Sequence, residues 1–393
     1  MKYAKLSAVS IINPSKPKTP NPELHCSFVP MEYIDDISGT ILQMDSRSMG
    51  EVEKGYTSFQ ENDVLFAKIT PCMENGKCAI ARNLINGIGF GSNEFHVLRA
   101  TKETTPEWIY YYLRQERIRI QAVHWFRGTA GQQRVPSTFL QELEIPLPPL
   151  PEQKRIAAIL DKADHLRRLR RYALELGDTY LQSVFLEMFG DPGKNPKGWK
   201  NSMIGDVVTF SQYGTSTKSN DEKCGYPVLG MGSITYSGEI DLSGISYVEI
   251  DEEECQNLRL EQGDIIFNRT NSTELVGKTA YWDLDTDAVI ASYLVKLKLR
   301  KDVLPEFFTA LLNSPYYKTL FQLRCRKAVG QSNISPTYLK EFPVLIPPVS
   351  LQEKYAEIVK HRKRLRSQQQ ESLRQAELLF QSLLAKAFEG EGL

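Results

Sequence analysis

The feature that most constrains this chain is a long internal duplication. Residues 106–189 match residues 305–388 at a constant offset of 199, and the alignment needs no gap. A period this long indicates a duplicated domain rather than a solenoid repeat, and it predicts a pseudo-two-fold molecule. Such a molecule suits a target with two halves, of which duplex DNA is the commonest.

Identical residues mark the repeat along its whole length. The matched pairs include Pro106 and Pro305, Leu113 and Leu312, Gly131 and Gly330, Pro148 and Pro347, Gln153 and Gln352, Gln182 and Gln381, and Phe189 and Phe388. A looser likeness continues upstream at an offset of 201, where Asp63–Phe66 resembles Asp264–Phe267. Residues 20–60 and 210–260 show little likeness, so we expect one frame with two different faces, each reading something different.

Composition places the chain among ordinary globular proteins. Its 393 residues are 41% hydrophobic and 24% charged, which favours two domains with real cores. We expect no transmembrane helix, no signal peptide and a cytoplasmic location. The six cysteines form no CxxC pair, so we expect reduced thiols and no metal. A formal net charge of +0 argues against a non-specific nucleic-acid coat, but it leaves room for a reader with local basic patches.

Proline punctuation divides the chain into four segments. We expect a globular domain over 1–145, a proline hinge and long helix over 146–190, a second domain over 191–342, and a second hinge and helix over 343–393. The predicted strands are 63–69, 77–81, 94–98, 264–268 and 289–299, and the predicted short helices are 107–123 and 306–313. The predicted class is α+β.

The two long helices are predicted over Glu152–Phe189 and Gln352–Phe388. Apolar residues recur in each at spacings of three or four, as in a coiled coil. The predicted seam residues are Ile159, Ala163, Leu166, Leu169, Ala173, Leu176, Tyr180 and Val184 in the first helix, and Ile358, Leu365, Ala376, Leu379, Leu383 and Ala387 in the second. We expect each helix to be about 55 Å long and to pair with the other.

The hinge-plus-helix segments resemble a known family. The strings LEIPLPPLPEQKRIAAILDKAD and FPVLIPPVSLQEKYAEIV, and the stretch GYTSFQENDVLFAKITPCMENGKCAIA, are similar to regions of the specificity subunits of type I restriction–modification enzymes. This resemblance implies two target-recognition domains, each reading half of a bipartite DNA sequence, and no catalytic site. It implies that the helices pack antiparallel and set the spacer.

The same resemblance implies the partners. Two methyltransferase (M) subunits would dock on the chain and methylate adenine N6, with S-adenosylmethionine bound in those subunits and no cofactor bound by this chain. Restriction/translocase (R) subunits would join them on double-stranded DNA, and no membrane is involved.

Residue chemistry points to polar loops as the DNA-contacting surface. Arg, Lys, Asn and Gln supply base-edge and phosphate contacts, and glycines permit close backbone approach. The candidates are Lys68, Lys77, Arg127, Gln132, Gln133 and Arg134 in the first copy, and Asn268, Arg269, Asn271, Lys278, Arg326, Lys327, Gln331 and Asn333 in the second. The alternatives are a polar capping loop for 127–134 and simple surface exposure for the lysines.

Other sequence patterns say less about the function of the chain. The basic clusters 167–171 and 360–366 are either solvated helix faces or contacts to DNA or methyltransferase. Gly277-Lys278-Thr279 mimics the end of a phosphate-binding loop, but Ser272 stands where its first glycine is required. No adenine-methylation tetrad or HExxH motif occurs, so intrinsic catalysis is not expected. A solitary DNA-binding protein and a non-reading assembly scaffold are the rival functions.

Overall fold

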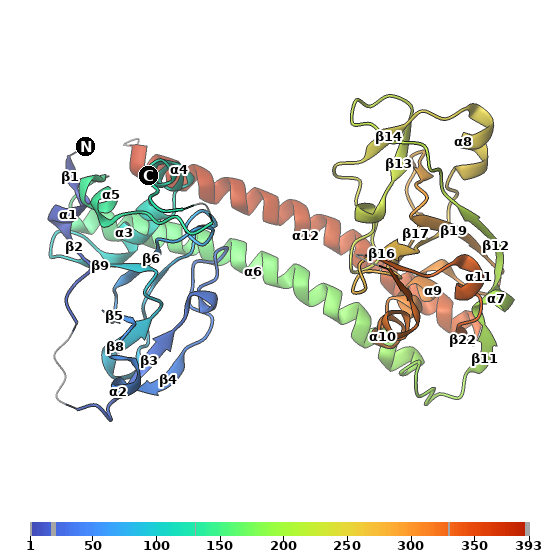
Figure 1. Cartoon of the computed structure of the whole chain (residues 1–393), viewed down its shortest axis with the longest axis horizontal. Coiled ribbons are helices and arrows are strands. Elements are labelled where there is room, and N and C mark those ends of the chain that lie inside the picture. The colour runs from blue at the N-terminus through green and yellow to red at the C-terminus, as the bar shows by residue number, and fades with distance from the viewer. Residues whose placement is uncertain (1, 17–20, 130, 329–330, 390–393) are drawn as a thin grey trace. The chain divides into compact units, whose positions relative to one another are not determined.

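The chain forms two compact units. The computed structural model describes residues 2–16, 21–129, 131–328 and 331–389, without the side chains of Asp178, Lys327 and Ala328 (Figure 1). Unit 1 comprises residues 1–172 and 371–393, and unit 2 comprises residues 173–370. Each unit therefore holds one globular part and a segment of each long helix, whereas the sequence predicted each helix as a segment of its own.

Two four-stranded sheets form the frame of unit 1. The first has the order β2-β9-β6-β7 and is antiparallel throughout, and in the second, β4-β3-β8-β5, strands β3 and β8 run parallel. Their bounds are β2 Ser10–Ile12, β9 Phe95–Ala100, β6 Val64–Ala67, β7 Cys78–Ile80, β4 Asp45–Ser48, β3 His25–Val29, β8 Ile88–Gly91 and β5 Thr57–Gln60.

Strand β6 is buried on both faces because it separates two cores. Val64 and Phe66 point into the core that holds the helices, and Leu65 points into the core between the sheets. The alternation of a strand sends successive side chains to opposite faces, so a short run that is apolar throughout must be an interior strand. The sequence predicted this strand over 63–69, and the prediction is confirmed for its centre.

Unit 2 repeats the four-stranded first sheet, but its second sheet has three strands rather than four. Its main sheet has the order β12-β19-β15-β17, and its second sheet has the order β14-β13-β18 with β13 and β18 parallel. The bounds are β12 Val208–Tyr213, β19 Leu294–Leu299, β15 Ile265–Asn268, β17 Thr279–Tyr281, β14 Ser246–Val248, β13 Tyr226–Leu229 and β18 Val289–Ile290. The parallel β3–β8 and β13–β18 pairs are therefore common to both copies, although residues 20–60 and 210–260 show little sequence likeness.

The duplicated aspartates before the central strands have different partners. The Asp63 carboxylate is 1% exposed and accepts two 2.8 Å hydrogen bonds from the Arg99 guanidinium. Lys298 stands at the position of Arg99 in the second copy, but it pairs with Glu261 at 2.7 Å. Asp264 is left with the Glu261 backbone amide, and burial raises its pKa.

Short elements complete each unit. Two-stranded antiparallel sheets pair β1 (Tyr3–Lys5) with β10 (Glu144–Pro146) and β11 (Lys200–Met203) with β22 (Pro343–Ile346). The short helices are α1 Leu6–Val9, α2 Met49–Val52, α5 Ser137–Glu142, α7 Ile204–Val207, α8 Glu252–Leu258 and α11 Pro336–Leu339, with 3-10 turns η1 Met31–Tyr33, η2 Ile85–Gly87 and η3 Met231–Ser233.

The helix predicted over 107–123 is two helices. Helix α3 spans Pro106–Leu113 and α4 spans Glu116–Val123, and the second copy has the same break between α9 (Pro305–Leu312) and α10 (Pro315–Arg324). Pro315 begins α10 and cannot continue a preceding helix, since it lacks an amide hydrogen. Glu116 occupies the same position in the first copy, where no proline reveals the break. The strand predicted over 289–299 is likewise interrupted, between β18 and β19.

The long helices begin earlier than predicted. Helix α6 spans Leu150–Phe189 and α12 spans Val349–Glu389. Pro151 lies inside the first turn of α6, where a helix requires no amide hydrogen. The prediction that the whole run 146–151 excludes helix was therefore wrong at its end. Among the described residues, no helix is long and apolar enough to cross a membrane.

The two helices pack antiparallel within each unit. In unit 1 Ile156 and Leu160 of α6 share a core with Phe380 and Leu384 of α12. In unit 2 the end of α6 packs on the start of α12, through Phe185, Phe189, Tyr355 and Val359. The α+β class and the pairing of the helices are confirmed.

The predicted seam was wrong in the middle of both helices. Six predicted seam residues are more than a third exposed, namely Leu166, Leu169, Leu176, Tyr180, Leu365 and Leu379. In unit 1 the buried stripe continues instead through Ala163, Asp164 and Arg167, because the Arg167 guanidinium lies 4.2 Å from the ring centre of Phe380 and pairs with Asp164. A charged pair in the seam cannot be recognised from apolar spacing.

Candidate nucleic-acid interface

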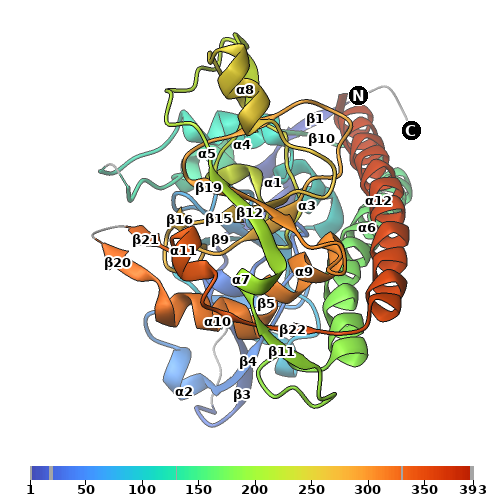
Figure 2. The same ribbon diagram turned by 90° about the vertical axis from the view of Figure 1, so that its right-hand side faces the viewer.

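The polar loop of the second copy is a β-hairpin. Strands β20 (Arg326–Ala328) and β21 (Gln331–Asn333) pair with each other, and β21 also pairs with β16 (Thr270–Asn271) to form a three-stranded sheet (Figure 2). The sequence placed candidate residues in two segments about 60 residues apart. The structure joins these segments side by side on one surface of unit 2.

Unit 1 joins the equivalent segments in the same way. Arg134 forms bridges with both Ile69 and Arg127, and the amide of Thr70 donates to the Gln133 carbonyl oxygen at 3.0 Å. The amide of Val135 donates to the Lys68 carbonyl oxygen at 2.8 Å. Both copies therefore present a loop or hairpin that is hydrogen-bonded to the segment following the central strand. We call these two surfaces the hairpin surfaces of units 1 and 2.

Arg127 and Gln132 are the most accessible candidates in unit 1. Both side chains are exposed, while Lys68 and Gln133 are half-buried. Arg134 is committed to the protein, since its Nε and Nη2 atoms donate to the Glu94 carboxylate at 2.8 and 2.9 Å. The bonds from Arg134 lower the pKa of Glu94. A bidentate contact of Arg134 to guanine would have to displace this ion pair, so Arg134 is better placed to hold the loop in position.

Arg326 and Gln331 are the exposed candidates on the hairpin surface of unit 2. Asn333 holds the surface together, because its Nδ2 donates to the Thr270 hydroxyl at 2.8 Å. The Asn271 side chain accepts the amide of Ser272 at 2.8 Å and so fixes the turn after β16. The side chain of Lys327 lies outside the described residues.

Arg269 is bordered by aromatic residues that the sequence analysis missed. Its guanidinium lies 4.8 Å from the ring centre of Tyr213 and donates to the Ser292 carbonyl oxygen at 3.1 Å. The exposed fractions of Tyr213 and Tyr293 are 47% and 43%, and the Arg269 amide donates to the Tyr293 carbonyl oxygen. Exposed aromatic residues beside an arginine can stack on sugars or bases. No sequence motif marks them, because their exposure is set by the fold.

Two candidates in unit 2 were predicted wrongly. Asn268 has no exposed surface and Lys278 is 9% exposed, so neither side chain can reach DNA in this structure. Lys278 donates to the carbonyl oxygens of Met231, at 3.0 Å, and Ile234, and burial lowers its pKa. Its duplicate Lys77 donates to the Met31 carbonyl oxygen at 3.0 Å. The duplicated lysine thus anchors the 3-10 turn of each unit.

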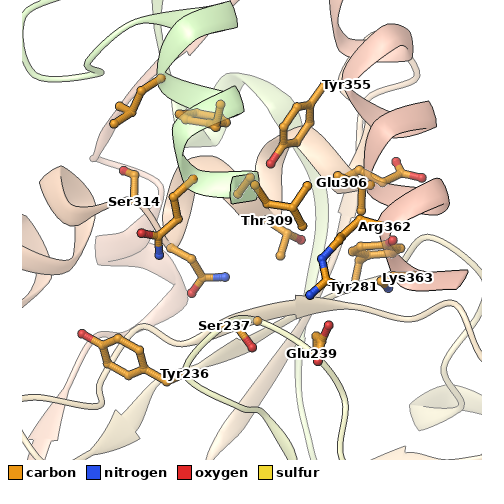
Figure 3. Close-up of a pocket in the computed structure, with 18 of the residues that line it drawn as sticks. Tyr236, Ser237, Glu239, Tyr281, Glu306, Thr309, Ser314, Tyr355, Arg362 and Lys363 are labelled. Carbon is orange, nitrogen blue, oxygen red and sulfur yellow. The ribbon is translucent and has the colours of Figure 1, made fainter. Parts of the chain in front are cut away.

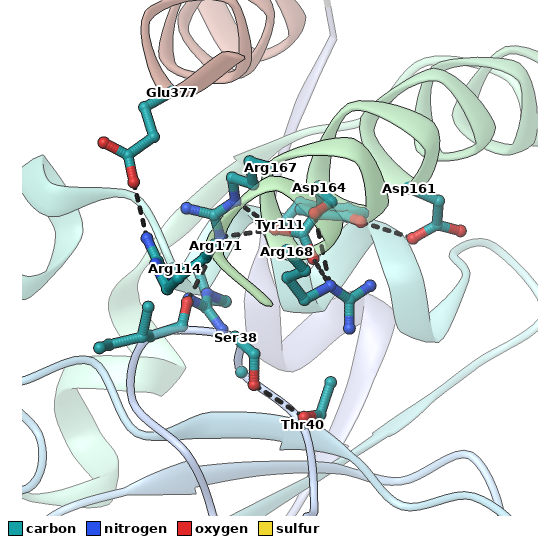
Figure 4. Close-up of polar contacts among 12 residues, drawn as sticks. Ser38, Thr40, Tyr111, Arg114, Asp161, Asp164, Arg167, Arg168, Arg171 and Glu377 are labelled. Atoms are coloured by element: carbon teal, nitrogen blue, oxygen red, sulfur yellow. Dashed lines mark hydrogen bonds and ion pairs between the residues drawn. The ribbon is translucent and has the colours of Figure 1, made fainter. Parts of the chain in front are cut away.

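Several arginines and lysines of the basic clusters on the long helices are paired with acids. Arg167 and Arg168 both bind Asp164, and Arg171 lies 2.6 Å from Glu377 (Figure 4). In unit 2, Lys360, Lys363 and Arg366 pair with Glu306, Asp283 and Glu239. These charges serve packing within each unit, which favours the reading of a paired helix face over DNA contact. Among the described residues, no three His, Cys, Asp or Glu side chains are grouped as metal ligands.

A family model described as the type I restriction modification DNA specificity domain matches residues 43–174 and 196–375. The chain belongs to this family. The two matched segments correspond to the two copies of the repeat, and each contains its hairpin surface.

Relatives within this family cover parts of the chain. The chain is 36% identical over 181 residues to the EcoEI specificity subunit of Escherichia coli, covering 46% of this chain and 30% of the relative. It is 30% identical over 277 residues to the EcoKI specificity subunit of E. coli strain K12, covering 63% of this chain and 58% of the relative. The matches thus span less than two thirds of either relative.

Solved structures show the same fold over nearly the full length. The type I restriction–modification S subunit from M. genitalium superposes with a TM-score of 0.59 at 16% identity, covering 98% of this chain and 96% of that one. A chain from a study of assembly and conformational transition of the type I restriction–modification system also gives a TM-score of 0.59, at 21% identity, covering 98% and 97%. At these identities the likeness concerns the fold alone.

Proposed function

We propose that this protein is the DNA-reading specificity subunit of a type I restriction–modification complex. The observation that carries the proposal is that both copies share the main-sheet topology and hydrogen-bond a polar loop to the segment after the central strand, while that segment differs between them, being Lys68-Ile69-Thr70 in unit 1 and Arg269-Thr270-Asn271 in unit 2. A duplicated frame with different contact residues suits a DNA target made of two different half-sites. Each unit would read one half.

The exposed side chains on the hairpin surfaces have the chemistry for this readout. Arginine donates two hydrogen bonds to guanine in the major groove, and glutamine pairs with adenine in the same way. Arg127 and Gln132 would read for unit 1, and Arg326 and Gln331 for unit 2. Lys68, Lys77, Gln133, Asn271, Lys327 and Asn333 would contact phosphates or support the surface, and Arg269 would act with Tyr213.

We propose that the chain has no catalytic role and that methyltransferase subunits dock on the long helices. Each unit leaves apolar side chains of α6 exposed: Leu169 and Tyr172 in unit 1 are 51% and 62% exposed, and Leu176 and Tyr180 in unit 2 are 55% and 53% exposed. Exposed apolar side chains at helical spacing favour a partner helix. S-adenosylmethionine would be bound by those subunits, and restriction subunits would join the same complex.

Methylome sequencing tests this proposal. Cells that express the chain with its methyltransferase partner should carry an N6-methyladenine motif in two parts, and cells without the chain should not. Arg127→Ala combined with Gln132→Ala should relax one half-site only, and Arg326→Ala combined with Gln331→Ala should relax the other. The matched control is Arg374→Ala, an exposed arginine of α12 that pairs with Glu371.

The two rival functions, a solitary DNA-binding protein and a non-reading scaffold, predict different results. A solitary binder would bind DNA tightly and specifically alone, with no dependent methylation. A non-reading scaffold would leave the motif unchanged in both double variants, which would refute the proposal. Specific discrimination should fall by about 1–3 kcal/mol per lost base contact.

The spacer gives a second test of the same proposal. Helices α6 and α12 each contribute residues to both units. Adding one helical turn to both should change the tolerated gap between the half-sites and leave the half-sites themselves unchanged. Altered half-sites with an unaltered gap would refute the role of the helices as a ruler.

A further inference from the structure

Unit 2 contains a pocket that is lined by none of the residues proposed to read DNA. Its volume is about 140 Å³, and it lies between the end of α6, the loop 236–239, helix α9 and the start of α12 (Figure 3). Its apolar wall is formed by Leu181, Phe185, Tyr355 and Val359. An apolar cavity of about 150 Å³ is large enough to hold a benzene ring.

One buried hydroxyl on the pocket wall has no partner. Thr309 is 6% exposed and its Oγ1 makes no hydrogen bond among the described residues, whereas the buried Tyr281 hydroxyl has the Asp283 carboxylate beside it. Figure 3 shows both side chains on the lining of the pocket. Buried polar atoms are nearly always hydrogen-bonded, so the orphan Thr309 hydroxyl is a group on the cavity wall that a ligand could bind.

The equivalent space in unit 1 is filled by larger side chains. Tyr110 and Arg114 occupy the positions of Thr309 and Asn313 at the offset of 199. The Tyr110 hydroxyl donates to the Gly39 carbonyl oxygen at 3.1 Å. Arg114, labelled in Figure 4, donates to the Ile37 carbonyl oxygen at 2.8 Å. The pocket of unit 2 therefore results from the replacement of a tyrosine and an arginine by shorter residues.

A pair of left-handed glycines confirms that the two sites are equivalent. Gly39 (φ +65°) and Gly238 (φ +86°) lie in corresponding loops. A Cβ added to Gly39 would clash with Arg114, and a Cβ added to Gly238 would clash with the duplicate residue, Asn313. The clash would be with Arg114 Nη1 at 1.2 Å in unit 1 and with Asn313 Nδ2 at 2.4 Å in unit 2. The loops thus approach α3 and α9 alike, and only the side chains between them differ.

The charges around the two sites differ in sign. Asp164, whose charge acts on Arg114 in unit 1, is replaced by Lys363 at the same offset. Lys318 on the pocket wall donates to the Tyr236 carbonyl oxygen at 3.1 Å and lies 3.4 Å from the centre of that ring. Burial lowers the pKa of Lys318 to about 8, and no carboxylate among the described residues lies within ion-pair distance of it.

The carboxylates that line the pocket already have cationic partners. Glu239 pairs with Arg366 at 2.9 Å, and Glu306 lies 3.5 Å from Lys360. Lys363 is likewise held by Asp283. Among the described residues, the ammonium of Lys318 thus has no carboxylate partner, and a ligand with an anionic group would supply one.

We propose that this pocket binds a small molecule that carries one aromatic ring and a carboxylate. The ring would lie against Phe185 and Tyr355, the carboxylate would pair with Lys318, and Thr309 would donate its orphan hydroxyl to the ligand. The site is separate from the hairpin surface of unit 2, since no residue of that surface lines the pocket.

Titration of the full-length protein with three probes of the same size tests the proposal. Isothermal calorimetry with phenylacetate, benzyl alcohol and 2-phenylethylammonium should give binding in that order of affinity, with about a tenfold preference for the anion over the cation. Lys318→Gln should remove this preference and leave the binding of benzyl alcohol within about twofold.

Filling the pocket provides the structural control. Thr309→Tyr, which restores the residue of unit 1, should abolish binding of all three probes, and Ala310→Leu should weaken it from the adjacent position. Tyr110→Phe, at the equivalent position of unit 1, should leave binding unchanged. No binding of any probe to the wild type would show that the cavity holds only water and would overturn the proposal. Equal affinity for the anion and the cation would overturn the role of Lys318.

Discussion

Replacing Gln153 with alanine should destabilise unit 1 by about 4 kcal/mol, at about 1 kcal/mol for each hydrogen bond lost. The side chain is fully buried. Its Oε1 accepts from the Thr104 hydroxyl at 3.1 Å and the Thr105 amide at 3.2 Å, and its Nε2 donates at 2.9 Å to the carbonyl oxygens of Glu103 and Pro148. All four hydrogen-bonding sites of the amide are used, so the side chain ties the start of α6 to the segment before α3.

For Gln352, the duplicate of Gln153 in the second copy, we expect a smaller loss of stability. Gln352 accepts from the Leu304 amide at 2.8 Å and donates to the carbonyl oxygens of Asp302 and Pro347 at 3.1 and 2.9 Å. Val303 stands where Thr104 stands in the first copy, so one hydrogen bond is missing. Gln352→Ala should therefore cost about 3 kcal/mol.

Hydrogen–deuterium exchange in a urea series measures each unit separately, through the peptides around residues 103–108 and 302–307. The matched control is Gln381→Ala, since Gln381 is also duplicated but is exposed on α12. A loss for Gln153→Ala no larger than that of the control would refute the argument that this amide clamps the helix. Equal losses for Gln153→Ala and Gln352→Ala would refute the bond-by-bond magnitude.

Three further predictions concern the duplicated frame. Asp63→Asn should lower the free energy of unfolding by about 2–3 kcal/mol because it breaks two charged hydrogen bonds. Asp264→Asn should be neutral or stabilising at pH 7, since the raised folded pKa of Asp264 means that its charged form disfavours the fold. Urea unfolding at pH 7 measures both variants, and equal losses of stability would contradict this difference. The folded pKa of Glu94 is lowered, so its stabilisation exists above its ordinary pKa and disappears as the pH falls through the folded value. Glu94→Gln should therefore lower the urea midpoint at pH 7 and have little effect at pH 2, and a loss that does not depend on pH would contradict the ion pair. Lys278→Met should destabilise unit 2 but leave the salt dependence of DNA binding unchanged, whereas Arg326→Ala should reduce that slope by about 1 if it contacts phosphate; filter binding across a salt series distinguishes the two.

Much of the fold could be predicted because its signals are local. The apolar runs at 64–67 and 265–267 are typical of interior strands, and prolines and long amphipathic stretches mark the hinges and helices. The break between α3 and α4 could not be predicted, since Glu116 carries no terminating signal in the first copy. The seam of the long helices was missed because Asp164 and Arg167 are buried as a pair, which apolar periodicity does not reveal.

The hairpin surfaces were predicted in part. Polar glycine-bearing loops are visible in the sequence, and the structure places them beside the segments that follow the central strands. The orientation of single side chains is not visible, because it depends on neighbours distant in the chain. Lys278 lies inward because carbonyl oxygens of the turn near Met231 accept hydrogen bonds from its ammonium group. Arg134 is held by Glu94, 40 residues away in the chain.

The sequence by itself determined that this protein is one frame built twice, because a gap-free offset records a duplication whatever the packing. It also determined the elements of that frame, because apolar period and proline act within a few residues. Only the tertiary structure decided which polar residues are free to meet a partner. It also decided that Thr309 and Asn313 leave a pocket that Tyr110 and Arg114 fill in the other copy, since space between side chains is a property of the elements that surround it.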